Sequence, residues 1–235
     1  MNKKYELTDD TIMVEDHILY RIKALKDFST INSGDLGGYV ESEANLSHEG
    51  DCWIFNDGKV YEDALVSKRA WVCGDAQVFG NAMVAESARV FGNAQVCENA
   101  QICETAWVFE YARVCGKAHI SGYSQIYENA KIYGYARVSG STCVLGDVRV
   151  YENAKIYGYA QVFEGAEVSG DARVFGNAQV FGSVWVCGDA QIFNKAWISG
   201  ESKVDYGIWN KTIERNDRYY LISTTLKKIL AEYDQ

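Results

Sequence analysis

The hexad AQVFGN at residues 76–81 is one copy of a six-residue unit that decides the fold of this chain. From Ile54 to Val204, every sixth residue is Val or Ile, which gives 26 consecutive matches without an insertion. Two residues before this aliphatic position Ala occurs 19 times in 26, and two residues after it Gly occurs 14 times. A period this strict indicates a repeat architecture.

Each position of the hexad has a physical role. Side chains alternate between the faces of a strand, so the aliphatic residue and the small residue two positions earlier point the same way, toward the core. Gly followed by Asn, as in Gly80-Asn81, tolerates positive φ and lets the chain turn a corner. Three such hexads close one triangular coil, and the coils stack as a parallel β-helix. The sequence therefore predicts an all-β triangular solenoid.

The repeat resembles that of the hexapeptide-repeat proteins, in which an aliphatic residue is followed four positions later by a small one, as in Val78 and Ala82. This resemblance implies a left-handed helix. The residue directly after the aliphatic position is Phe, Tyr or Cys 18 times in 26. That variant, together with the lead-in GDLGGYVESE at residues 34–43, resembles the YdcK-like branch common in phage and prophage genomes. The resemblance implies a phage-borne protein.

The chain is expected to have three parts. Residues 1–53 form an N-terminal β cap and a lead-in coil, with a hairpin around Glu15-Asp16-His17. Residues 54–206 form the parallel β-helix. Residues 207–235 form a C-terminal cap or tail with a short strand and a short helix, which either covers the open end of the solenoid or docks elsewhere.

Composition limits the class of protein. The formal net charge of −9 argues against general duplex-DNA binding, which needs a basic surface. No apolar run approaches the length of a membrane span, and residues 1–6 lack the apolar core of a signal peptide, so we expect the cytoplasm, or the host cytoplasm if the protein is phage-encoded.

The seven cysteines lie on the repeat lattice rather than in CxxC pairs. We expect reduced thiols rather than a disulfide framework or a zinc site. Cys97 and Cys115 stack in neighbouring coils, but zinc needs three or four converging ligands and only His119 is near them in the lattice. The sequence thus predicts no metal site and no cofactor.

Residues one coil apart share one of three outward faces. The first face, built on Ile54 and its successors in later coils, has Arg89 as its only charge. Its ten aromatic residues are Trp53, Phe55, Trp71, Phe91, Trp107, Phe109, Tyr127, Phe163, Phe181 and Trp197. An apolar surface of this extent indicates a subunit interface, and the family resemblance implies a trimer. The alternative is that the chain's own ends cover it.

The second and third faces, built on Val60 and Val66, carry the cations. Arg113, Lys131 and Arg149 recur once per coil on the second face, beside Tyr133 and Tyr151. The third-face column is Arg137, Lys155 and Arg173. In an acidic protein, such a patch with neighbouring rings predicts a site for an anion, such as a nucleotide, or else a solvated face.

Function follows from these faces. We expect a non-catalytic, oligomeric binding scaffold that sequesters a nucleotide-type ligand or occludes a host protein, in a phage as a counter-defence. The alternative is an acyltransferase using acetyl-CoA, the activity of the best-known hexapeptide-repeat proteins. That chemistry needs a general base, and only His17, His48 and His119 are available. A γ-class carbonic anhydrase would need three zinc-binding His residues and fails on count, because His17 and His48 lie in the cap and His119 is alone on an outward strand position.

Overall fold

The computed structural model describes residues 3–210. It contains two compact units, residues 1–123 and 124–235. The strand expected at Arg218–Ile222 and the helix expected after it lie outside the described residues. No helix within residues 3–210 is long and apolar enough to cross a membrane.

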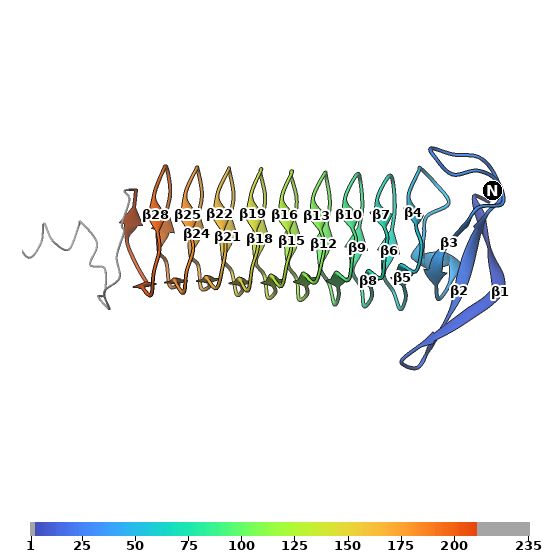
Figure 1. Cartoon of the computed structure of the whole chain (residues 1–235), viewed down its shortest axis with the longest axis horizontal. Helices are drawn as coiled ribbons and strands as arrows, with labels where there is room; N and C mark the ends of the chain where they lie inside the picture. The colour runs from blue at the N-terminus through green and yellow to red at the C-terminus, as the bar shows by residue number, and fades with distance from the viewer. Residues whose placement is uncertain (1–2, 211–235) are drawn as a thin grey trace, which may run out of the picture. The chain divides into compact units, whose positions relative to one another are not determined.

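The first unit begins with the predicted β hairpin (Figure 1). Strand β1 (Tyr5–Val14) pairs antiparallel with β2 (His17–Ala24), and Glu15 turns the corner with a φ of 53°. Strand β2 then pairs antiparallel with β3 (Leu36–Val40). These three strands make the cap, and β3 joins it to the coils.

The lead-in coil is longer than the regular coils, as the sequence indicates. Val40 lies opposite Val60 and Leu46 opposite Val66, so the chain takes more than three hexads to return to the same face. The two extra residues lie between Leu46 and Ile54. The 3₁₀ helix η1 (Glu43–Asn45) precedes them, and the Ser42 side chain accepts a hydrogen bond from the Ala44 amide at its start.

Three parallel sheets form the coils of the first unit. The first-face sheet contains β4 (Trp53–Ile54), β7 (Trp71–Val72), β10 (Arg89–Val90) and β13 (Trp107–Val108). The second-face sheet continues from β3 through β5 (Lys59–Val60), β8 (Gln77–Val78), β11 (Gln95–Val96) and β14 (Arg113–Val114). The third-face sheet contains β6 (Leu65–Val66), β9 (Met83–Val84), β12 (Gln101–Ile102) and β15 (His119–Ile120).

The second unit repeats the three parallel sheets. Its first-face strands are β16 (Gln125–Ile126), β19 (Cys143–Val144), β22 (Gln161–Val162), β25 (Gln179–Val180) and β28 (Trp197–Ile198). Its second-face strands are β17 (Lys131–Ile132), β20 (Arg149–Val150), β23 (Glu167–Val168), β26 (Trp185–Val186) and β29 (Lys203–Val204). Its third-face strands are β18 (Arg137–Val138), β21 (Lys155–Ile156), β24 (Arg173–Val174), β27 (Gln191–Ile192) and β30 (Ile208–Trp209).

The aliphatic and alanine columns form the core, as predicted. Ile102 is fully buried and lies in register with Val84 and Ile120 in the adjacent coils. Ala94 and Ala100 in the small-residue column are also fully buried. Backbone amides donate to carbonyls one coil further on, so the stack satisfies its own polar groups.

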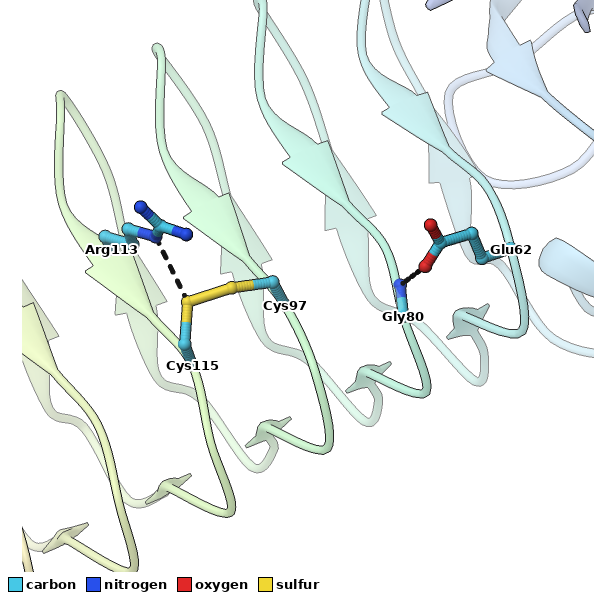
Figure 2. The surroundings of a disulfide bond; sticks show 5 residues. All are labelled: Glu62, Gly80, Cys97, Arg113 and Cys115. Carbon is cyan, nitrogen blue, oxygen red and sulfur yellow. Dashed lines mark hydrogen bonds between the residues drawn. A yellow bond between two sulfur atoms is a disulfide. The ribbon is translucent and has the colours of Figure 1, made fainter. Parts of the chain in front are cut away.

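The corners hold one feature that the sequence analysis missed. Where the corner position is not Gly, it is often Glu, and these residues adopt the left-handed conformation, as at Glu62 with a φ of 54°. Its carboxylate accepts a hydrogen bond of 2.7 Å from the amide of Gly80, one coil further on (Figure 2). Glu152 does the same for the Gly170 amide at 2.6 Å. This charge-assisted bond offsets part of the cost of the left-handed backbone.

The register changes after Val204, as the sequence indicates, but the parallel pairing continues. Trp209 of β30 lies opposite Ile192 of β27, so the chain takes slightly less than three hexads to return to this face. Trp209 is 8% exposed and its indole N–H donates to the Tyr206 carbonyl at 2.9 Å. In the last described strand of the third face, a large aromatic residue thus takes the buried position that Val or Ile occupies in the regular hexads.

Candidate anion-binding groove

Three cations of the second unit line one side of a groove. Arg137, Lys155 and Arg173 are the first residues of β18, β21 and β24, and each lies directly opposite the next in the parallel ladder. They point outward because the second residue of each strand is buried in the core. Adjacent strands are about 4.8 Å apart, so the three side chains form a continuous basic column.

The groove is also lined by residues from the preceding corner of each coil, two residues before each cation. They are Tyr135, Asn153 and Asp171. The groove has a volume of about 530 Å³ and is open to solvent along its length. An exposed tyrosine ring, an amide and three cations therefore face the same space, with one carboxylate at the end where Arg173 lies.

The three cations have no carboxylate within ion-pairing distance among the residues that the structure describes. Their mutual repulsion is thus not offset by a neighbouring acid at close range. A bound anion would relieve that repulsion and accept hydrogen bonds from Arg137 and Arg173 in bidentate form. This is the arrangement in the second unit that best fits an anionic ligand.

The second-face cations lie in a different electrostatic setting. Lys131 and Arg149 are direct neighbours on β17 and β20. Arg149 forms an ion pair of 3.1 Å with Glu167 in the next coil, and the Tyr151 hydroxyl donates to the same carboxylate at 3.4 Å. Glu167 thus supplies an acid that competes with any anionic ligand at Arg149.

Arg113 belongs to the first unit, and its guanidinium Nε donates to Cys115 Sγ at 3.2 Å. The structure brings together Arg137, Lys155 and Arg173 and, separately, Lys131 and Arg149.

The rings beside the cations stack on one another. Tyr133 and Tyr151 have centroids 5.1 Å apart and nearly parallel planes. On the third face, Phe175 stacks on Tyr157 at 4.8 Å and on Phe193 at 5.0 Å. Because these ring faces already contact each other, they offer edges rather than open faces to a ligand. The cations, and not base stacking between these rings, would supply most of the recognition.

The cap covers one end of the predicted aromatic face. Trp53 is 1% exposed and packs against Phe28 and Tyr5, with centroid distances of 5.4 and 6.3 Å. It is therefore part of the core between cap and coils and is not available as an interface residue. The sequence analysis placed it on the outer face because the period alone does not show the path of the cap.

The rest of the aromatic face consists of contacting rings. In the first unit, Arg89 lies over Trp71 at 4.5 Å and over Trp107 at 5.4 Å, which places the face's one charge between two indoles. In the second unit, Phe163 and Phe181 stack at 4.7 Å, and Trp197 is 42% exposed. The remaining predicted members of this face, Phe55, Phe91, Phe109 and Tyr127, are half-buried.

The three histidines are occupied by local contacts. His17 Nδ1 lies 3.0 Å from Glu41 in the cap, and this hydrogen bond raises the pKa of His17 and lowers that of Glu41. His48 Nδ1 accepts from the Lys4 amide at 3.3 Å. His119 on β15 has Gln101 Oε1 at 3.4 Å and Cys103 Sγ at 3.7 Å. Each ring is thus held by groups of its own unit.

The prediction of reduced thiols at Cys97 and Cys115 was wrong for this structure. The two residues form a disulfide between adjacent coils, with Cα atoms 4.7 Å apart (Figure 2). The Cα atoms of in-register neighbours in a parallel ladder are close enough for a disulfide. The spacing of one full coil between Cys97 and Cys115 was therefore the sequence signal that could have predicted this bond. The five other cysteines, Cys52, Cys73, Cys103, Cys143 and Cys187, are free.

Comparison with known proteins supports the repeat type. A family model of the YdcK β-solenoid repeat matches residues 76–92, which contain β8 to β10, and residues 172–188, which contain β24 to β26. No curated protein matches the chain significantly. Each matched segment covers about one coil. The chain is therefore a β-solenoid in which one segment of each unit is similar to the YdcK-type repeat.

Proposed function

We propose that this protein is a non-catalytic β-solenoid scaffold that binds a phosphate-bearing, nucleotide-type anion in the groove along Arg137, Lys155 and Arg173. The observation that carries the proposal is the stack of three outward cations without a carboxylate partner among the described residues. In a phage-borne protein, the use that fits is sequestration of a nucleotide signal in the host cytoplasm as a counter-defence.

Charge reversal in the groove should weaken this binding. The variant Arg137→Glu/Arg173→Glu is expected to bind ATP or inorganic tripolyphosphate at least about tenfold more weakly, since one hydrogen bond to a charged group contributes about 1.5–3 kcal/mol. Binding by the parent protein should weaken as salt is raised, because screening acts on exposed charges. Isothermal calorimetry at low and physiological ionic strength measures both effects.

Arg149→Glu is the matched control for the groove. Arg149 is an exposed arginine of the same unit that already pairs with Glu167, so its reversal should leave anion affinity nearly unchanged. If the folded double variant binds the anions as tightly as the parent protein, the groove is only a solvated face. If the Arg149 variant loses equal affinity, net charge rather than the groove determines binding.

We further propose that copies of the chain assemble as a trimer through the aromatic first face. Support comes from the half-buried rings around Arg89 and from the exposed Trp197. Clusters of apolar rings at the surface of each unit are rarely left in water. The flat sides of such an assembly would also suit occlusion of a host protein. A pull-down from a host lysate, analysed for both proteins and small molecules, distinguishes this use from nucleotide capture.

The trimer predicts a specific change in mass. Trp71→Lys/Trp107→Lys should lower the molar mass seen by light scattering from that of a trimer to that of a monomer, because each lysine places a charge in the apolar contact. Met83→Lys, on the third face, is the control and should leave the mass unchanged, since Met83 is 42% exposed outside the proposed contact. A monomeric mass for the parent protein would contradict this assembly.

The acyltransferase alternative has a direct assay. From β4 to β29 the strands recur every six residues, so no substrate loop leaves the coils in that span. The only histidine on a strand of the coils is His119, whose ring nitrogens contact Gln101 and Cys103. Release of free CoA from acetyl-CoA in the presence of the protein would favour this enzyme over the scaffold.

A further inference from the structure

A second cluster of chemically active groups lies in the first unit. Cys97 and Cys115 directly follow β11 and β14, and Glu98 follows Cys97 at the corner of its coil. The two sulfur atoms and a Glu98 carboxylate oxygen lie within 4.8 Å of one another. Two sulfurs and one carboxylate therefore converge from adjacent coils, and the sequence analysis missed the third member.

The fold places the three groups in a suitable environment for a metal. Cys97 is 1% and Cys115 is 6% exposed, while Glu98 is exposed at the corner. Glu98 adopts the left-handed conformation with a φ of 59°. The two sulfurs are thus buried, and the carboxylate beside them is on the side that faces solvent.

The charge of the site also balances. Arg113 Nε is 3.2 Å from Cys115 Sγ, so the guanidinium favours a thiolate at that position (Figure 2). Two thiolates and the Glu98 carboxylate carry three negative charges, and Arg113 contributes one positive charge. A divalent cation then brings the sum to zero, which lowers the cost of holding these charges under the surface.

We propose that reduction of the Cys97–Cys115 disulfide creates a zinc site formed by both thiolates and the Glu98 carboxylate. Thiolate ligands favour Zn²⁺ over the hard cations Mg²⁺ and Ca²⁺, which take oxygen ligands. Three protein ligands leave the fourth tetrahedral position to water. The disulfide and the metal exclude each other, because a sulfur in the disulfide is no longer a thiolate.

A trialkylphosphine reductant breaks the S–S bond and is oxidised to the phosphine oxide, whose oxygen atom comes from water. The two hydrogens of that water are transferred to the two sulfurs, so that both cysteines become thiols. Zinc binding then releases the two thiol protons to solvent, since each metal-bound sulfur is a thiolate. In a reducing compartment, zinc would therefore hold the two coils together in place of the disulfide.

The test is a zinc titration of the full chain. The phosphine-reduced protein, freed of reductant, is titrated with Zn²⁺ in competition with a chromophoric chelator, and the oxidised protein is treated in the same way. We expect one Zn²⁺ per reduced chain and none at this site in the oxidised chain. With Co²⁺ as the probe, the intense charge-transfer band of thiolate ligation should appear only after reduction.

Single variants identify the ligands. Cys97→Ser and Glu98→Gln should each weaken zinc binding by at least about tenfold, because loss even of an outer partner of a metal ligand costs about 10–100-fold. Cys73→Ser, a free half-buried cysteine of the same unit, is the control and should bind as the parent does. Absence of zinc binding by the reduced parent, or parent-like affinity in the Cys97 or Glu98 variant, overturns the proposal.

Discussion

Replacing Ile102 by Ala is expected to lower the free energy of unfolding by about 2–5 kcal/mol, the usual range for deletion of a buried Ile side chain. Ile102 is fully buried on β12 between Val84 and Ile120 of the adjacent coils. The cavity cannot close easily, because the parallel ladder fixes the positions of both neighbours. Urea unfolding followed by circular dichroism measures the change.

Two neighbouring substitutions are the controls for this effect. Ile102→Val removes one methylene and should cost about 0.5–1.5 kcal/mol. Gln101→Ala changes the exposed residue before Ile102 and should stay within about 0.5 kcal/mol of the parent protein. If Gln101→Ala destabilises the protein more than Ile102→Ala does, the assignment of inward and outward positions is wrong.

Reduction of the Cys97–Cys115 disulfide, in the presence of a metal chelator, should lower the free energy of unfolding by about 3 kcal/mol, as the chain-entropy model gives for a loop of this size. The two cysteines have a sequence separation of 18, so the bond closes a single coil. The opened loop lets the unfolded chain explore more conformations. The same urea titration, with and without reductant, measures the difference.

The Cys97→Ser variant tests the origin of that difference. It should unfold at the same urea concentration with or without reductant, because no disulfide is left to reduce. Cys73→Ser should keep the parent's full response to reductant, since Cys73 is a free cysteine. Equal stability of the oxidised and reduced parent protein would show that the cross-link does not stabilise this unit.

The sequence by itself determined the features that depend on regular spacing. Every sixth residue from Ile54 is buried because a period of six with two-residue strands places the same position inward in every unit. The spacing of three hexads likewise set which outward residues are neighbours, such as Arg137 and Lys155. The step of eight between Leu46 and Ile54 also indicated the longer lead-in coil.

The sequence predicted which cations line the candidate site, but it did not predict which of them form ion pairs. The spacing predicted two equivalent basic columns. Only the structure showed that Arg149 pairs with Glu167 while the groove cations have no such partner among residues 3–210. An ion pair depends on the rotamers of two long side chains, and residue spacing does not determine rotamers.

The tertiary structure alone decided the contacts that break or cross the period. Trp53 is buried because the cap folds back over the first coil, a long-range path that the repeat does not encode. Glu62 replaces Gly at a left-handed corner because its carboxylate reaches the Gly80 amide of the next coil. Cys97, Glu98 and Cys115 converge because a strand end and a corner of adjacent coils meet at one point. Periodicity fixes the direction in which a residue points, and packing in three dimensions fixes which groups it meets.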